Sequence, residues 1–358
     1  MSDSGSATID TQETFIRQRH AKYFAMCLKV LPRSMATLDT QRMTLVYFAV
    51  SGLDLLNSLA LIESRRAAII DWVYAMQVLP DKDNPGLNAQ ACGFRPGSSV
   101  GAPYNPKCEA QACLKHDSGH LAMSFTALSV LAVLGDDFSR VNRQAIVQSM
   151  RALQSDSGEF FATADKNESD VRFLYCACVV SHLIKDWSGV NKATAVAYIK
   201  SRQTYDGSFA AAPGLEGHAG YTFLCVASLY LMDQLDEVYT KVEQDRIIRW
   251  CIMRQQTGFT GRPGKLVDSC YSFWVGGTLK ILGAYDLVDR TCLRGFLLST
   301  QSTTTGGLAK SPDTLADPLH SYLALCGFSL SGEPDVLPLD AAINMSERAS
   351  QHAASLKF

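Results

Sequence analysis

Ser201–Ala210 reads SRQTYDGSFA, and Gly220–Met232 reads GYTFLCVASLYLM. The first stretch ends an amphipathic helix at a glutamine and enters a glycine-containing turn, and the second is an almost continuous apolar helix. The same order recurs from Arg151 (RALQSDSGEF), Met253 (MRQQTGFTGR) and Leu298 (LSTQSTTTGGLA). The repeat glutamines are spaced by 49, 53 and 45 residues: Gln154, Gln203, Gln256 and Gln301. A repeat of about fifty residues indicates the architecture more directly than any single motif.

The alternation of helix types predicts the fold. Apolar helices begin near Asp170, Gly220, Ser269 and Pro318, each preceded by a helix with one polar face, and strand signals are nearly absent. We therefore predict an all-α fold, a single α/α toroid in which apolar helices form an inner ring and amphipathic helices an outer ring. Ring closure would bring the starts of the inner helices together at one end, around a central cavity.

The repeats also predict the domain limits. A further copy starts near Gln77 and carries an inserted loop, 81–116, before its apolar helix. We assign residues 14–332 to one barrel domain, 1–13 to a disordered N-terminus, and 333–358 to a C-terminal tail that is poorly ordered or variable.

Composition excludes several classes of function. The 358 residues are 47% hydrophobic and 19% charged, as in globular proteins. A net charge of −2 provides no basic field for nucleic acid. No apolar run reaches the roughly eighteen residues of a transmembrane helix. The first residues are polar, and most of the eleven cysteines lie in apolar helical patterns, so we expect a reducing, cytoplasmic location.

Lys265–Trp274, KLVDSCYSFW, places a carboxylate and a thiol at the start of an inner helix. His320 lies at the next inner-helix start, fifty residues after Cys270. In a closed ring, Asp268, Cys270 and His320 would meet at one rim. Such a set suits Zn²⁺ and leaves one coordination position open, as catalytic sites do. The same pattern is also typical of a capped helix with partly buried polar side chains.

Cationic residues accompany these three. Arg262 and Lys265 occupy the preceding turn, and His218 occupies the equivalent turn one repeat earlier. Together with Tyr271 they would form an anion pocket, in which the forked donors of arginine and the point charge of lysine suit a diphosphate. Each charge taken alone is also typical of a solvated turn.

These residues lie in motifs that resemble the β subunits of protein prenyltransferases, and most closely the geranylgeranyl type I branch. The similarity runs from Arg17 to Leu330 and includes GRPGKLVDSCYSFW, LEGHAGYTF, DSGHLAMSFTAL, SDVRFLYCA and DPLHSY. The resemblance implies a heterodimer with a helical-repeat α subunit. It also implies that one zinc ion, held by Asp268, Cys270 and His320, binds the cysteine of a C-terminal CaaX sequence, on substrates such as Rho-type small GTPases.

The resemblance also implies roles for other positions. His218, Arg262, Lys265, Tyr271 and Lys310 would bind the diphosphate of geranylgeranyl diphosphate. The lipid wall would include Thr44, Phe48, Tyr175 and Trp274. The peptide pocket would include His120, Ala122, Arg172 and Phe173, and would accept leucine or phenylalanine at the final position.

Two positions favour the twenty-carbon lipid. Farnesyl-type β subunits carry a tryptophan at the cavity floor, where this chain has Thr44. They also use an aspartate to help bind magnesium, where this chain has Lys310, so we expect no magnesium requirement. Tyr221 resembles the farnesyl-type motif, and the farnesyltransferase β subunit therefore stays the alternative.

Two other classes of function are alternatives to a prenyltransferase subunit. A non-catalytic toroid scaffold would be indicated by loss of a metal donor, but all three are present. An isoprenoid cyclase would need D-x-D-D or D-D-x-x-D motifs, and neither occurs. In the inserted loop, Cys108, Cys113, His116 and His120 resemble a second metal site, although their spacing matches no common zinc finger.

Overall fold

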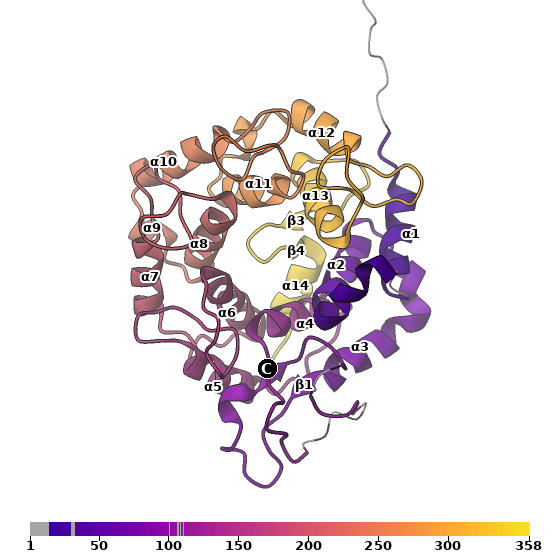
Figure 1. Ribbon diagram of the computed structural model, residues 1–358, viewed down its shortest axis with the longest axis vertical. Coiled ribbons are helices and arrows are strands. Elements are labelled where there is room, and N and C mark those ends of the chain that lie inside the picture. Colours follow the sequence, from indigo (N-terminus) through magenta and orange to yellow (C-terminus); the bar gives the residue numbers. More distant parts are fainter. Residues whose placement is uncertain (1–13, 30–32, 100, 106, 108, 110) are drawn as a thin grey trace, which may run out of the picture.

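Two concentric layers of helices form a closed ring in the computed structural model (Figure 1), which describes residues 14–29, 33–99, 101–105, 107, 109 and 111–358. Within these residues, six helices form the inner ring: α2 (Arg42–Leu55), α4 (Leu121–Val133), α6 (Val171–Ile184), α8 (Ala219–Leu231), α11 (Tyr271–Ile281) and α13 (Pro318–Ser331). Each inner helix packs against the next, and α13 packs against α2. This closure confirms the predicted α/α toroid.

The outer ring consists of amphipathic helices that cover the inner ones: α1 (Arg17–Cys27), α3 (Arg66–Ala75), α5 (Arg143–Leu153), α7 (Lys192–Ser201), α10 (Lys241–Ile252) and α12 (Arg290–Ser299). The short helix α9 (Leu235–Val238) follows α8. Short 3-10 helices occupy Arg33–Gln41, Leu59–Arg65, Ala89–Ala91 and Tyr285–Leu287. Residues 1–13, predicted to form a disordered N-terminus, lie outside the described part of the chain.

Side-chain caps begin most of these helices. Outer helices α5, α7, α10 and α12 start at capping side chains of Asn142, Asn191, Thr240 and Asp289. Inner helices α4, α6, α8 and α13 start at His120, Asp170, His218 and Asp317. Because a capping side chain satisfies an otherwise unpaired backbone N–H, it fixes where each helix begins. The inner-ring caps include residues predicted for function.

Repeat glutamines join several units to the next outer helix. Gln154 accepts the Asn191 N–H at 2.7 Å and donates to the Asn191 carbonyl at 3.1 Å. In the fourth repeat the equivalent residue is Gln255, which bonds both backbone groups of Asp289. The alignment on Gln256 is therefore wrong by one residue, because the turn aims the first glutamine of the pair at the neighbouring helix while Gln256 is exposed.

A repeat glutamine also closes the ring. Gln301 accepts the Ile16 N–H at 3.1 Å and the side chain of His20 lies 3.0 Å from its Oε1. Nδ1 of the buried His20 accepts the Gly307 N–H at 3.0 Å. The first outer helix is thus held to the last repeat by polar contacts across more than 280 residues of sequence.

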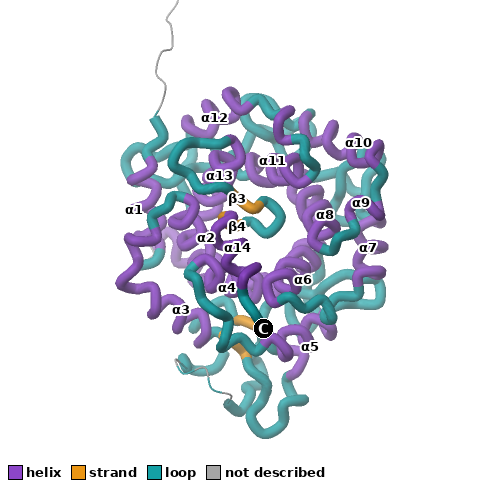
Figure 2. Tube along the Cα trace, turned by 180° about the vertical axis from the view of Figure 1, so that it is seen from behind, coloured by secondary structure: helices purple, strands orange, loops and turns teal. Residues whose placement is uncertain are grey.

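The inserted loop, 81–116, extends beyond the ring next to α3 and α5 (Figure 2). Its base is a two-stranded pair, β1 (Gln77–Val78) with β2 (Gly93–Phe94). The buried Arg95 donates to the carbonyls of Ala75 and Ala102, both at 2.8 Å, and pairs with Asp117. These contacts tie the described part of the insertion to the outer ring.

The C-terminal tail is folded, so the expectation of a poorly ordered tail is wrong. Strands β3 (Leu339–Asp340) and β4 (Met345–Ser346) form a hairpin that lies in the middle of the ring, and α14 (Glu347–Ser355) follows it (Figure 1). Buried Asp54 on α2 accepts a hydrogen bond from Ser346 and pairs with Arg348 at 2.8 Å. The tail is ordered by inner-ring side chains that are distant in sequence.

Candidate active site

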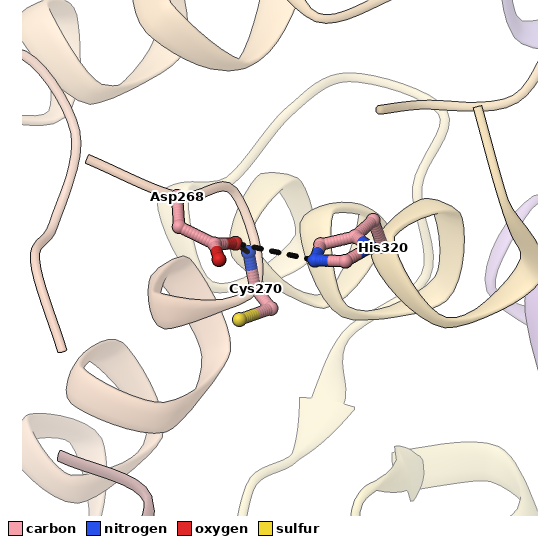
Figure 3. A group of neighbouring side chains, drawn as sticks. All are labelled: Asp268, Cys270 and His320. Carbon is pink, nitrogen blue, oxygen red and sulfur yellow. Dashed lines mark hydrogen bonds and ion pairs between the residues drawn. The ribbon is translucent and has the colours of Figure 1, made fainter. Parts of the chain in front are cut away.

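Asp268, Cys270 and His320 converge at one rim of the ring (Figure 3). Their potential ligand atoms all lie within 4.8 Å of one another, and Oδ1 of Asp268 is 3.4 Å from Nε2 of His320. Cys270 is the residue before α11, and its N–H donates to Asp268 Oδ1 at 3.0 Å. The turn before α11 and the first turn of α13 therefore present oxygen, sulfur and nitrogen donors to one point.

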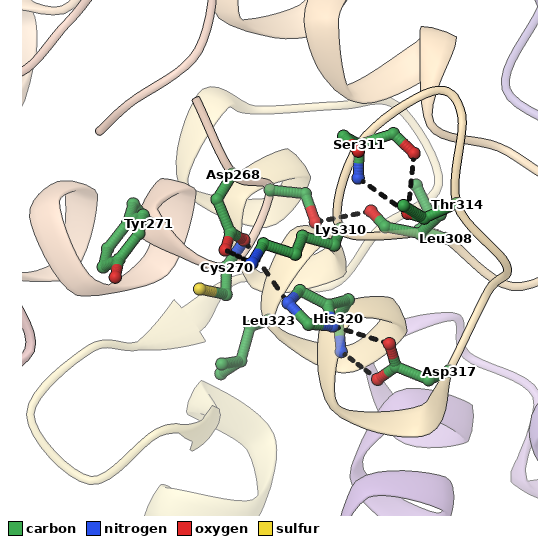
Figure 4. A network of polar contacts seen from close by, with 12 residues as sticks. Asp268, Cys270, Tyr271, Leu308, Lys310, Ser311, Thr314, Asp317, His320 and Leu323 are labelled. Atoms are coloured by element: carbon green, nitrogen blue, oxygen red, sulfur yellow. Dashed lines mark hydrogen bonds and ion pairs between the residues drawn. The ribbon is translucent and has the colours of Figure 1, made fainter. Parts of the chain in front are cut away.

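Asp317 fixes the direction of the histidine. One of its oxygens accepts the His320 N–H at 2.9 Å and thereby caps α13, while the other lies 2.6 Å from His320 Nδ1 (Figure 4). Because Nδ1 is engaged by Asp317, Nε2 is left to face Asp268. A carboxylate behind a histidine ligand is a usual feature of metal sites.

The donor set fits a zinc ion. Burial raises the pKa of the Cys270 thiol well above its ordinary value, and the charge of Asp268 raises it further. Burial alone would lower the pKa of His320, but contacts with Asp268 and Asp317 raise it to about 9. A divalent cation relieves both effects, since it binds thiolate and neutral imidazole in place of the two protons. Zinc ligands lie about 3.5 Å apart around a tetrahedral ion, and the Asp268–His320 separation of 3.4 Å is close to this value.

The residues predicted for the diphosphate site begin directly beside the three donors, since Tyr271 follows Cys270 in the chain. His218 accepts the Gly220 N–H at Nδ1, so its Nε2 carries the proton and donates to the Tyr271 hydroxyl at 3.1 Å. Burial raises the pKa of Tyr271 to about 12, which keeps its hydroxyl protonated. Arg262 pairs with Glu216 at 2.8 Å, and Lys265 is exposed.

Lys310 reaches the metal-ligand group from the turn before α13. Its Nζ lies 3.7 Å from Asp268 Oδ2, and its side chain is 58% exposed (Figure 4). The structure thus brings the ammonium group predicted for the diphosphate site to the edge of the predicted metal site. Its exposure leaves the side chain open to a ligand that enters from the rim.

The four residues predicted for the peptide pocket also come together, at the starts of α4 and α6. The rings of His120 and Phe173 meet edge to face at 5.6 Å, and Ala122, the second residue of α4, is partly exposed. Arg172 bonds Glu168 at 2.9 Å and Asp170 at 3.0 Å, with its side chain 54% exposed. Glu168 and Asp170 were not predicted for the site, although Asp170 stands at a recognisable helix start.

The predicted lipid-wall residues belong to a larger aromatic belt on the inner ring. Ring contacts of 5.4 to 5.9 Å run in sequence through Phe48, Tyr47, Phe125, Tyr175, Phe223 and Trp274. Tyr322 joins this belt through Phe48 at 5.7 Å. Thr44, the small residue beside the belt, is partly exposed and contacts Met123. Helical spacing marks the additional aromatic residues only as core, so sequence reasoning missed them.

Comparisons with known proteins agree with this arrangement. The family described as prenyltransferase alpha-alpha toroid domain matches residues 15–345. The geranylgeranyl transferase type-1 subunit beta of Dictyostelium discoideum is 38% identical over 338 residues, 93% of this chain and 96% of that protein. The chain belongs to the protein prenyltransferase β-subunit family.

Other members of the family support the same placement. The Arabidopsis thaliana geranylgeranyl transferase type-1 subunit beta is 35% identical over 334 residues, 91% of this chain and 87% of that protein. The fold matches Candida albicans protein geranylgeranyltransferase-I complexed with GGPP, with a TM-score of 0.82 at 23% identity over 96% of this chain and 100% of that one. This prenyltransferase subunit is therefore part of a transferase, as its sequence predicts.

The structure also bears on a second metal site and on membrane-spanning helices. Among the residues that the structure describes, Asp268, Cys270 and His320 form the one group of three or more potential metal ligands. Cys108, proposed for a second site, lies outside those residues. No helix in the described ranges has the length and apolar character needed to cross a bilayer.

Proposed function

We propose that this chain is the catalytic β subunit of a protein geranylgeranyltransferase type I. In this reaction the cysteine sulfur of a CaaX sequence forms a bond to the first carbon of the geranylgeranyl group, while the bond from that carbon to the diphosphate oxygen breaks. The observation that carries the proposal is the convergence of Asp268, Cys270 and His320 next to the His218–Tyr271 pair and to Trp274 of the aromatic belt.

Asp268, Cys270 and His320 would hold one zinc ion. When bound, zinc supplies the Lewis acidity that lowers the pKa of a substrate thiol. Asp317 keeps His320 in the orientation that a ligand needs. Burial of Asp268 and Cys270, each 8% exposed, keeps water away from the donors.

Four residues would bind the diphosphate and stabilise the charge that develops as it leaves: His218, Arg262, Lys265 and Tyr271. Arg262 and Lys265 supply positive charge, and the protonated hydroxyl of Tyr271, held by His218, supplies a hydrogen-bond donor. Lys310, whose ammonium lies at the edge of the metal site, would take the place of a divalent ion. We therefore propose that transfer requires no magnesium.

The pocket surfaces suit the other parts of the two substrates. Thr44, Phe48, Tyr175 and Trp274 provide apolar area for a long isoprenoid, and the small Thr44 leaves room near the belt. Arg172 would contact the peptide backbone. His120, Ala122 and Phe173 would accept a terminal leucine or phenylalanine, as on Rho-type small GTPases.

An α subunit is the proposed partner. The relatives are named as β subunits, and the active-site rim of this chain exposes an apolar residue at the same place in three successive repeats: Leu215 at 55%, Leu266 at 89% and Leu315 at 91% exposed. Exposed leucines in equivalent turns are typical of a surface that a partner covers. A cytoplasmic location fits the free thiols of the cysteines that the structure describes.

The test is a transfer assay on the heterodimer. The chain is co-expressed with a candidate α subunit and given fifteen- or twenty-carbon diphosphates with peptides ending in leucine, phenylalanine or serine. We expect preferred transfer of the twenty-carbon group to leucine- and phenylalanine-ended peptides. Preferred fifteen-carbon transfer to the serine-ended peptide would support the farnesyl alternative, and no transfer with any pair would support a non-catalytic scaffold.

A further inference from the structure

Polar side chains connect the starts of the inner helices α6 and α8, which pack side by side in the ring (Figure 1). Tyr221 is the third residue of α8, and its hydroxyl donates to Oδ2 of Asp170 at 3.3 Å. The other oxygen of this carboxylate, Oδ1, lies 3.0 Å from Nε of Arg172. One aspartate thus joins a tyrosine of α8 to an arginine of α6.

The helix cap fixes the direction of the Asp170 carboxylate. Its Oδ1 accepts the Arg172 backbone N–H at 2.8 Å and thereby begins α6. The side chain of Asp170 is only 13% exposed, whereas that of Arg172 is 54% exposed. Because the cap holds Oδ1 toward Arg172, the second oxygen is left to face α8. The hydroxyl of Tyr221 and the guanidinium of Arg172 are therefore held on opposite oxygens of one carboxylate.

Arg172 presents part of its guanidinium to the predicted peptide pocket. Nη2 donates to Glu168 at 2.9 Å and Nε faces Asp170, but Nη1 donates to no residue that the structure describes. The guanidinium carbon lies 5.5 Å from the centroid of the Phe173 ring, which belongs to the same pocket. Without a donor at Oδ2, Asp170 could pair with Arg172 through both oxygens, the arrangement that carboxylates and guanidinium groups favour. That pairing would draw the arginine away from the pocket.

The surroundings of Tyr221 keep its hydroxyl a donor. Burial raises the pKa of Tyr221, and the charge of Asp170 raises it further, so the hydroxyl is protonated at neutral pH. The ring of Tyr221 meets the ring of His218 edge to face at 5.7 Å. A phenylalanine would keep this ring contact and lose only the bond to Asp170. The roles of the hydroxyl and of the ring can therefore be measured separately.

We infer that Tyr221 is a positioning residue for peptide recognition, which acts through Asp170 to hold Arg172 toward the C-terminal peptide of the substrate. The inference rests on the proposed function, since Arg172 is assigned to the peptide there. It gives the tyrosine a role that does not depend on lipid length. Tyr221 is then compatible with a twenty-carbon lipid, although it resembles the farnesyl-type motif.

The test uses the full chain as a heterodimer with its α subunit. The Kd of a dansyl-labelled, leucine-ended CaaX peptide is measured on enzyme saturated with an unreactive analogue of geranylgeranyl diphosphate. We expect Tyr221→Phe to raise this Kd about fivefold, the effect of losing one hydrogen bond. The Kd of geranylgeranyl diphosphate and kcat should stay within about twofold of the wild type. Tyr230→Phe is the matched control, because this half-exposed tyrosine lies at the opposite end of α8.

A double-mutant cycle shows whether Tyr221 acts through the arginine. Arg172→Ala removes the group that Tyr221 positions, so adding Tyr221→Phe to this variant should change the peptide Kd by less than about twofold. Asp170→Asn keeps an equally good cap for α6 but removes the charge that pairs with Arg172. This variant should also raise the peptide Kd.

Three results would overturn the inference. An unchanged peptide Kd in Tyr221→Phe means that the hydroxyl does not position Arg172. An equal rise in the Arg172→Ala background means that Tyr221 contacts the peptide itself, and a weakened affinity for geranylgeranyl diphosphate alone means that it contacts that ligand instead. A wild-type heterodimer that transfers no geranylgeranyl group to the peptide refutes the proposed function, and the inference falls with it.

Discussion

Asp317→Ala removes two interactions whose effects are separable. One oxygen of Asp317 caps α13 at the His320 N–H, and the other orients His320 through Nδ1. Loss of an N-cap costs about 1 kcal/mol of unfolding free energy. Loss of a carboxylate behind a metal-ligating histidine weakens metal binding about 10- to 100-fold, which corresponds to about 1.4 to 2.7 kcal/mol. We expect Asp317→Ala to show both losses.

Asp317→Asn separates the two effects. Asparagine is an equally good N-cap, so the unfolding free energy of the metal-free protein should change by only a few tenths of a kcal/mol. The single amide oxygen keeps the cap at the His320 N–H, so the amide NH2 faces Nδ1 and cannot accept its proton, and zinc affinity should fall about tenfold. Zinc affinity is measured by competition with a chromophoric chelator, and stability by urea unfolding.

The control is Asp289→Ala, which removes the cap of outer helix α12 at the Cys292 N–H. This variant should lose about 1 kcal/mol of stability and keep its zinc affinity. The reasoning is refuted if zinc affinity of Asp317→Ala stays within threefold of the wild type, because His320 would then be oriented without the carboxylate.

Three further predictions concern ring stability and the diphosphate site. Gln255→Ala should lower the unfolding free energy, measured by urea titration, by about 1 to 2 kcal/mol, since two hydrogen bonds to Asp289 are lost. Gln256→Ala should leave the unfolding free energy unchanged. Equal effects of the two variants would contradict the repeat register. Burial lowers the pKa of His20 below 6.5, so the unfolded chain binds a proton at this imidazole more readily than the folded protein does. The unfolding free energy should therefore fall as the pH drops below 6.5. His20→Gln should make this fall less steep, and an unaltered slope would argue against the neutral His20 contacts. Lys310→Asp should make transfer increase with added magnesium, and a flat magnesium titration would exclude the role proposed for the ammonium group.

The sequence predicted the ring and the metal-ligand group because both follow from the repeat. Apolar helices must be buried, and a closed ring is the arrangement that buries all of them. Closure then places equivalent positions of successive repeats side by side. Asp268, Cys270 and His320 occupy such positions, so their convergence followed from spacing.

The repeat register and the tail were harder to predict because backbone geometry and distant partners decide them. Gln255 and Gln256 are chemically identical neighbours, and only the path of the turn determines which one reaches Asp289. The tail has little apolar periodicity of its own. It is ordered by residues such as Tyr47 and Asp54, which lie almost 300 positions earlier in the chain.

The central claim is that Asp268, Cys270 and His320 hold one metal ion to which the substrate cysteine binds. The most direct measurement is the absorption spectrum of the cobalt-substituted heterodimer, with and without a CaaX peptide. The account predicts one cobalt ion per chain, a thiolate-to-cobalt band that disappears in Cys270→Ala, and a stronger band when the peptide thiol binds. A wild-type spectrum without a thiolate band, or one that the peptide leaves unchanged, would contradict it.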